Sequence, residues 1–127
     1  MSGSNVPINS EGNQLIVDHL YTVHGYSTFN VKVKSGEFTG ASNFCIPRER
    51  ILSITETLSE MHKELKGRCE INDSDSDAYI VMEMDKLGHM YVCGQIGGSH
   101  EEHVLKFKYP TDQTVLVDLI RILKTLL

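Results

Sequence analysis

The chain has 127 residues, of which 40% are hydrophobic and 23% charged, and its formal net charge is −5. This length suits one domain with a substantial core, and the composition is that of an ordinary globular domain rather than a disordered or fibrous chain. The negative charge disfavours contact with the phosphates of nucleic acids.

The start of the chain is polar. Residues 1–13 are rich in Ser, Gly and Asn, and we expect them to form a disordered or loosely ordered tail. They lack the basic start and apolar run of a secretion signal, and no stretch of the chain has the roughly 18 consecutive apolar residues of a membrane span. We therefore expect a cytoplasmic protein without a membrane partner, with one domain over residues 14–127.

Three strands are predicted before the first helix. Residues 14–23 mix apolar and polar side chains, which indicates a strand with an irregularity. Alternating apolar and polar residues in 28–34 predict a second strand, and Ser35-Gly36 turns the chain into a third strand that ends at Cys45.

A long amphipathic helix is predicted over residues 47–66. Pro47 suits the first helical turn, and Gly67 suits the left-handed residue after the last turn. Apolar residues spaced three and four apart give this segment one apolar stripe, which must face a sheet: Ile51, Ile54, Leu58, Met61 and Leu65.

The second half begins with a short strand around Cys69 and Ile71, which ends at the polar run 72–77. Residues 78–85 and 89–95 predict two further strands, joined by a turn in which Gly88 can supply a positive φ. Because Tyr79 to Met82 are apolar on both faces, this strand is expected to be central in its sheet.

Residues 105–109 alternate as a last strand, and residues 111–127 form a second helix, with Thr111 or Asp112 as its N-cap. No internal repeat is visible in the sequence. The predicted class is α+β: a mostly antiparallel meander sheet of about six or seven strands, with helices at about 47–66 and 111–127 on one face.

Three cysteines, Cys45, Cys69 and Cys93, lie in predicted strands and form no Cys-x-x-Cys pair. An odd number of widely spaced cysteines indicates neither a disulfide framework nor a thiolate zinc site. We expect reduced thiols that act as small hydrophobic side chains.

Metal binding is not favoured. Asp73, Asp75 and Asp77 have the spacing that opens a calcium loop, but Ala78 stands where that loop needs Gly, and Met84 where it needs Glu. His100 and His103 form an HxxH pair for which no third zinc ligand is evident. A solvated acidic loop and surface histidines explain these residues, and we expect no metal and no cofactor.

Catalysis is not indicated either. Gly94-x-x-Gly97-Gly98 contains glycines, but it opens no helix that could hold a phosphate group. The sequence shows no nucleophile elbow and no dinucleotide fingerprint, so we expect a protein that is not an enzyme.

The order of segments, together with six short motifs, resembles the WapI-type immunity proteins from about Asn30 to the C-terminus. The motifs are Phe29-Asn-Val-Lys-Val-Lys34, Gly36-Glu-Phe-Thr-Gly40, Leu65-Lys-Gly67, Leu87-Gly-His-Met-Tyr-Val-Cys-Gly94, Leu105-Lys-Phe-Lys-Tyr109 and Thr111-Asp-Gln-Thr114. These small bacterial proteins, often left uncharacterised, protect a cell from contact-dependent polymorphic toxins. Each motif also has a structural rationale, so the resemblance indicates fold more firmly than function.

The resemblance implies a bacterial immunity protein that neutralises a cognate toxin domain by direct binding. Many such toxins have basic grooves, which agrees with the acidic charge of this chain. The residues expected to contact the toxin lie in two acidic loops: Asp73, Asp75, Asp77, Glu101 and Glu102.

Two alternatives stay open. A small-ligand or regulatory binding module would have a pocket on the concave side of the sheet, and its expected lining is Met82, Met84, Met90 and Tyr91. The surplus apolar residues of the last helix would instead suit a weak homodimer, so the oligomeric state is left open.

Overall fold

The computed structural model describes residues 5–10, 12–98 and 103–127. Its elements follow one another as β1 (Asn5–Ser10), β2 (Asn13–Val23), β3 (Tyr26–Ser35), β4 (Phe38–Pro47), α1 (Arg48–Glu64), β5 (Gly67–Asn72), β6 (Tyr79–Met84), β7 (Met90–Ile96), β8 (Leu105–Thr111) and α2 (Thr114–Lys124). None of the helices in this described part is long and apolar enough to cross a membrane.

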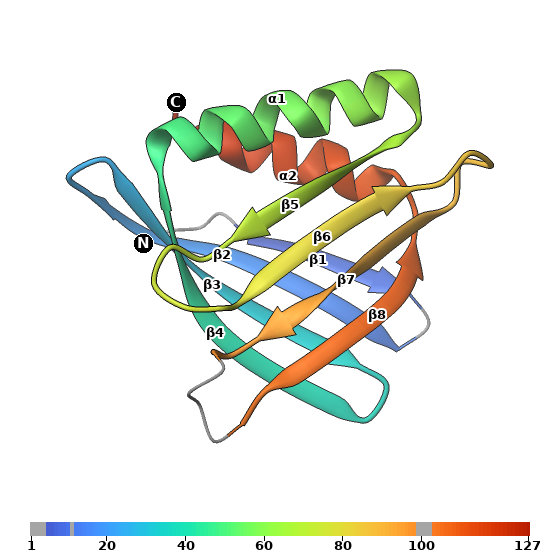
Figure 1. The fold of residues 1–127 in the computed structure, drawn as a ribbon, viewed down its shortest axis with the longest axis horizontal. Coiled ribbons are helices and arrows are strands. Elements are labelled where there is room, and N and C mark those ends of the chain that lie inside the picture. The colour runs from blue at the N-terminus through green and yellow to red at the C-terminus, as the bar shows by residue number, and fades with distance from the viewer. Residues whose placement is uncertain (1–4, 11, 99–102) are drawn as a thin grey trace.

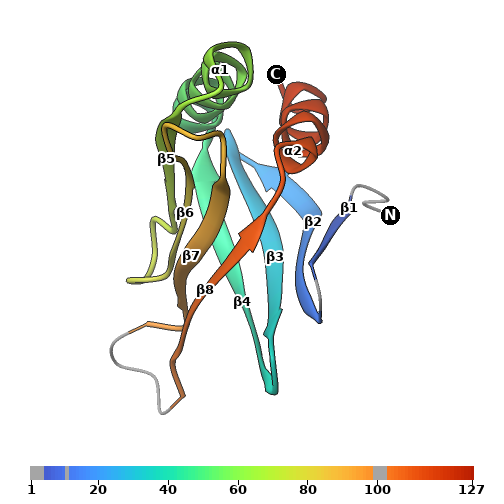
Figure 2. The same cartoon turned by 90° about the vertical axis from the view of Figure 1, so that its right-hand side faces the viewer.

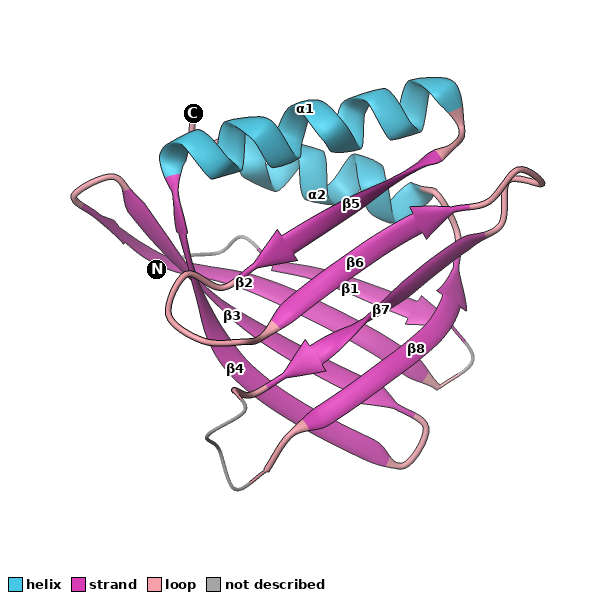
Figure 3. Cartoon of the chain, viewed as in Figure 1, coloured by secondary structure: helices cyan, strands magenta, loops and turns pink. Residues whose placement is uncertain are grey.

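The predicted α+β class, with antiparallel strands and two helices, is confirmed (Figures 1 and 3). The strands form two sheets rather than one meander, in the orders β1-β2-β3-β4 and β5-β6-β7-β8. Within the described residues, each half of the chain therefore has four strands followed by a helix. This structural repeat was not predicted, because no repeated sequence accompanies it.

Both helices lie at the same end of the two sheets and pack against each other (Figure 2). The apolar faces of both sheets and both helices meet in one core. Its largest fully buried side chains come from both halves of the chain: Leu15, Phe29, Phe44, Ile51, Leu58, Ile80, Met82, Met90 and Leu116. This shared core makes the two repeats one unit.

Helix α1 has the predicted apolar stripe and slightly different ends. Pro47 is its N-cap residue, and the backbone N–H of Arg48 donates a 2.8 Å hydrogen bond to the carbonyl of Gly25. At the other end the left-handed residue is Leu65 (φ 57°), whereas Gly67 (φ 119°) opens β5. The helix thus ends two residues before the predicted boundary.

The first strands differ from the expected start of the domain. β1 lies inside the stretch 1–13 for which we expect a loose tail, and it pairs antiparallel with β2. The predicted irregularity in β2 is confirmed as a shift in register between His19 and Tyr21. The predicted central strand is also confirmed, because β6 pairs with both β5 and β7.

Helix α2 begins later than the sequence predicts. Its first residue is Thr114, after the N-cap residue Gln113, and the carboxylate of Asp112 accepts a 2.9 Å hydrogen bond from the backbone N–H of Thr114. Hydrogen bonds from Thr114 lower the pKa of Asp112. Asp112 therefore stabilises the start of the helix, although it lies one position before the N-cap.

Candidate partner-binding site

The acidic loop, residues 73–77, joins β5 to β6 and is organised by its first residue. Asp73 is only 8% exposed, and its carboxylate accepts hydrogen bonds from the backbone N–H of Asp75 (3.1 Å) and the hydroxyl of Ser76 (2.5 Å). The Ser76 hydroxyl oxygen in turn accepts the backbone N–H of Ala78. An aspartate that binds the N–H two residues ahead forces a tight turn.

The same carboxylate connects the loop to the other half of the chain. The backbone N–H of Cys45 in β4 donates a 2.9 Å hydrogen bond to Oδ1 of Asp73, and the Cys45 carbonyl accepts the backbone N–H of Ser74 at 3.0 Å. β4 is an edge strand of its sheet, so these two bonds satisfy backbone groups that would otherwise lack a strand partner. The acidic loop is thereby fixed against β4.

The other two aspartates of the loop are exposed to solvent. Asp75 and Asp77 lie on the backbone that Asp73 holds in place. Burial and the negative charge of Asp75 raise the pKa of the Cys45 thiol. The negative charge of Asp75 therefore acts on a side chain of β4, the strand beside the acidic loop.

The five predicted contact residues consequently have different positions. Asp75 and Asp77 are exposed at the surface, whereas Asp73 is buried and accepts hydrogen bonds inside the loop. Glu101 and Glu102 lie outside the described residues. In the acidic loop, Asp73 thus anchors the backbone, and Asp75 and Asp77 present exposed carboxylates.

The calcium-like spacing of the acidic loop does not produce converging ligands. Both carboxylate oxygens of Asp73 accept hydrogen bonds from the protein itself. Among the described residues, no group of three or more His, Cys, Asp or Glu side chains is arranged to hold a metal ion. Of the predicted HxxH pair, His103 is described and exposed, and His100 lies outside the described residues.

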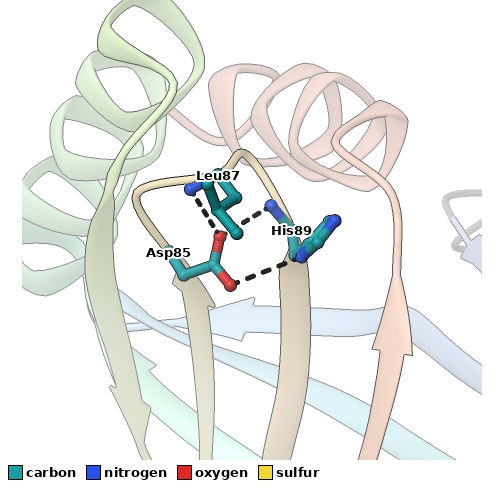
Figure 4. A network of polar contacts seen from close by, with 3 residues as sticks. All are labelled: Asp85, Leu87 and His89. Atoms are coloured by element: carbon teal, nitrogen blue, oxygen red, sulfur yellow. Dashed lines mark hydrogen bonds and ion pairs between the residues drawn. The ribbon is translucent and has the colours of Figure 1, made fainter.

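A second polar cluster stabilises the turn between β6 and β7 (Figure 4). The carboxylate of Asp85 accepts hydrogen bonds from the backbone N–H groups of Leu87 (2.9 Å) and His89 (3.0 Å), and its other oxygen lies 3.6 Å from Nδ1 of His89. The His89 N–H lowers the pKa of Asp85 most strongly. Gly88 has the predicted positive φ of 82°. These contacts give the cluster a role in shaping the hairpin.

The predicted ligand pocket is not formed by its four proposed residues. Met82, Met84 and Met90 are buried, whereas Tyr91 points to the other face of β7. Met82 lines an internal apolar cavity of about 30 Å³, and the other three border separate surface depressions on the two sides of the β6–β7 hairpin. A cavity of this size holds little more than one water molecule, so it cannot hold a ligand of metabolite size.

Comparison with known proteins supports the fold alone. No protein-family model and no curated protein matches the chain. The chain is similar to one in the crystal structures of MRP1/MRP2 from Trypanosoma brucei, with a TM-score of 0.58 and 9% sequence identity. The match covers 96% of this chain and 81% of that chain. The arrangement of two sheets and two helices therefore recurs in another protein with very different sequence.

Sequence reasoning identified the acidic loop but missed the separate role of Asp73. A local signal was available, because an aspartate followed by Ser-Asp-Ser can bind the backbone N–H two residues ahead. The contact with Cys45 had no such signal, since the two residues are 28 positions apart.

Proposed function

We propose that this protein is a bacterial immunity protein that neutralises a cognate toxin domain by direct binding. One observation in the fold supports this most directly. The acidic loop is held by Asp73 against β4, so that the exposed Asp75 and Asp77 project from a fixed backbone. A loop organised before binding loses less entropy in a complex than a mobile one.

Electrostatics favours a basic partner. The chain has a net charge of −5, and fixed carboxylates attract a positively charged groove during diffusional encounter. Inhibition of this kind needs no chemistry in the inhibitor, because a protein that covers the groove excludes the substrate. This proposal agrees with the sequence motifs that resemble immunity proteins.

The test is co-expression with each candidate toxin domain found encoded near this gene. We expect the wild-type protein to restore growth and to co-purify with the toxin domain, and we expect the complex to weaken as salt is raised. The D75N/D77N variant should bind more slowly and less tightly, while D73N would also alter the fold of the loop and is unsuitable for this purpose.

A matched control removes two negative charges elsewhere. Glu37 and Glu56 are exposed, in the β3–β4 turn and on α1, and the variant E37Q/E56Q has the same net charge as D75N/D77N. Equal weakening by both variants would assign the effect to overall charge rather than to the acidic loop. Failure of the wild-type protein to restore growth or to co-purify would refute the proposed function.

A further inference from the structure

The hairpin formed by β2 and β3 exposes large side chains beside its tip. Tyr21 is 55% exposed, Val23 52% and Tyr26 48%. Its two turn residues, His24 and Gly25, both have positive φ, as in the tight two-residue turns that join antiparallel strands. The hairpin extends beyond the body of the sheets (Figure 1). Exposed tyrosines in such a position have an apolar ring and a polar tip available to a partner.

These side chains share one face of the first sheet. Val23 pairs with Tyr26, Tyr26 pairs with Pro47, and Tyr21 pairs with Thr28, so all lie on the same side. This is the outer face, because the neighbouring residues of β3 and β4 on the other side, such as Phe29 and Ile46, are in the core. We call Tyr21, Val23, Tyr26 and Pro47 the tyrosine patch. A contiguous apolar patch has a different meaning from scattered exposed residues, since it commonly marks an interaction site.

Hydrogen bonds hold the hairpin that carries the tyrosine patch in place. The Thr22 hydroxyl forms hydrogen bonds with the His19 ring (2.9 Å) and with the Ser27 hydroxyl (2.8 Å). The tip is fixed to the start of α1 by the hydrogen bond from the Arg48 backbone to Gly25. Both tyrosines therefore stand on ordered backbone, which lowers the entropy lost when they are covered.

The tyrosine patch continues into the acidic loop. Tyr21 pairs with Thr28, and Thr28 pairs with Cys45, so these three residues form one row across β2, β3 and β4. Neighbouring strands are about 5 Å apart, which places Cys45 about 10 Å from Tyr21. Cys45 is the residue whose N–H and C=O bind Asp73 and Ser74. Aromatic side chains and exposed carboxylates thus lie at the two ends of one row, with Thr28 and Cys45 between them.

We propose that the tyrosine patch and the acidic loop form a single surface that binds a protein rich in exposed arginine or lysine. Tyr21 and Tyr26 stack on the cationic side chains and their aliphatic stems, and Asp75 and Asp77 pair with their charges. Tyrosine is also among the residues that most often dominate binding energy at interfaces. This inference rests on the proposed function, and it names the residues that act as anchors in the contact with the toxin.

A second copy of this chain fits the surface less well. In a two-fold dimer the patch would meet itself, so two chains of net charge −5 would bring their acidic loops to a common interface. A basic partner gains from the same carboxylates that oppose self-association.

The first test compares matched variants in binding to the co-expressed toxin domain. Y21A/Y26A should weaken binding by at least about tenfold, as expected when anchor residues are truncated. The control F38A/L87A removes two side chains that are 68% and 81% exposed and lie in other hairpins, and its affinity should stay unchanged. Y21K/Y26K keeps long side chains on the strands and should also abolish tight binding. Unchanged affinity in both tyrosine variants, with a wild-type protein that binds, would overturn this inference and leave the proposed function standing.

A second test does not depend on the toxin. A peptide of seven arginines is titrated into the full-length protein, and backbone amide shifts are followed by NMR, with a peptide of seven glutamates as control. Shifts should concentrate at Tyr21, Tyr26, Cys45 and Asp75, and should be lost in Y21A/Y26A. If the arginine peptide instead moves the amides of the acidic residues on α1, the proposed surface is wrong even when the toxin binds. Localised shifts together with a toxin that does not bind would leave the surface standing and refute the proposed partner.

Discussion

Asp73 accepts a hydrogen bond of 2.9 Å from the backbone N–H of Cys45, which joins the second half of the chain to an edge strand of the first. The neighbouring bond from Ser74 N–H to the Cys45 carbonyl completes the pair. These contacts resemble one step of strand pairing, made by a loop instead of a strand. They stabilise the junction of the two sheets and protect β4 from pairing with another chain.

Replacement of Asp73 should therefore destabilise the protein. D73A removes the acceptor for the N–H groups of Cys45 and Asp75 and for the Ser76 hydroxyl. These bonds are partly buried, and donors that lose their acceptor away from water cost about 1–3 kcal/mol. We expect a decrease of this size in the free energy of unfolding, measured by urea denaturation followed by circular dichroism.

The control for this prediction is D75A. It removes one negative charge from the same loop, and Asp75 is exposed, so the free energy of unfolding should change by less than about 0.5 kcal/mol. Equal destabilisation by D73A and D75A would show that loss of charge, rather than loss of the anchor, determines the effect.

Most elements of the fold were predictable because periodicity and turn residues are local signals. The stripe on α1 follows from the spacing of its apolar residues, the positive φ in the β6–β7 turn from Gly88, and the central position of β6 from apolar residues on both of its faces. The division into two sheets was not predictable in this way. It depends on whether the strands before α1 pair with the strands after it, and the sequence of a strand does not specify its partner strand.

The candidate site shows the same limit. The acidic composition of residues 73–77 is visible in the sequence, but the burial of Asp73 depends on β4, which lies far away in the chain. The tyrosine patch was missed for a related reason. Tyr21 and Tyr26 belong to a stretch rich in apolar residues, and the shift in register after His19 decides that Tyr21 lies on the same face as Tyr26.

Gly94 illustrates a sequence motif with a purely structural cause. A Cβ atom at this position would lie 2.2 Å from the backbone carbonyl oxygen of Tyr79 in the adjacent strand. Backbone cannot move aside as a flexible side chain can, so G94A should lower the free energy of unfolding by about 1–3 kcal/mol or more. Thermal unfolding followed by calorimetry would measure this.

A suitable comparison for G94A is C93A at the neighbouring position, where the side chain is half-buried on the outer face of the sheet. Its effect should be clearly smaller. A G94A protein as stable as the wild type would mean that β6 and β7 can separate locally at no cost, contrary to the observed register.

The cysteines should differ in reactivity. Cys69 is 3% exposed, and burial raises the pKa of its thiol from the ordinary 9.0 to about 11. This higher pKa alone reduces the thiolate fraction at pH 8 about a hundredfold, and the thiolate is the reactive form. In the folded protein a thiol reagent such as DTNB should label Cys69 last, and labelling should become complete only in denaturant. C69A should leave the number of rapidly labelled thiols unchanged, and a decrease in that number would contradict the assignment.

The turn between β6 and β7 predicts a specific dependence on pH. Hydrogen bonds to the carboxylate lower the pKa of Asp85 below its ordinary 3.8, with the largest effect from the backbone N–H of His89. Because the folded-state pKa is the lower one, this contribution to stability is fully present above the unfolded-state pKa and disappears as pH falls through the folded-state value. An NMR titration of the Asp85 carboxyl carbon, in the folded protein and in the unfolded peptide 83–91, should show the difference. H89A keeps the backbone N–H and removes only the ring, so most of the lowering should persist. If H89A instead restores the ordinary pKa, the ring and not the hairpin backbone holds the carboxylate.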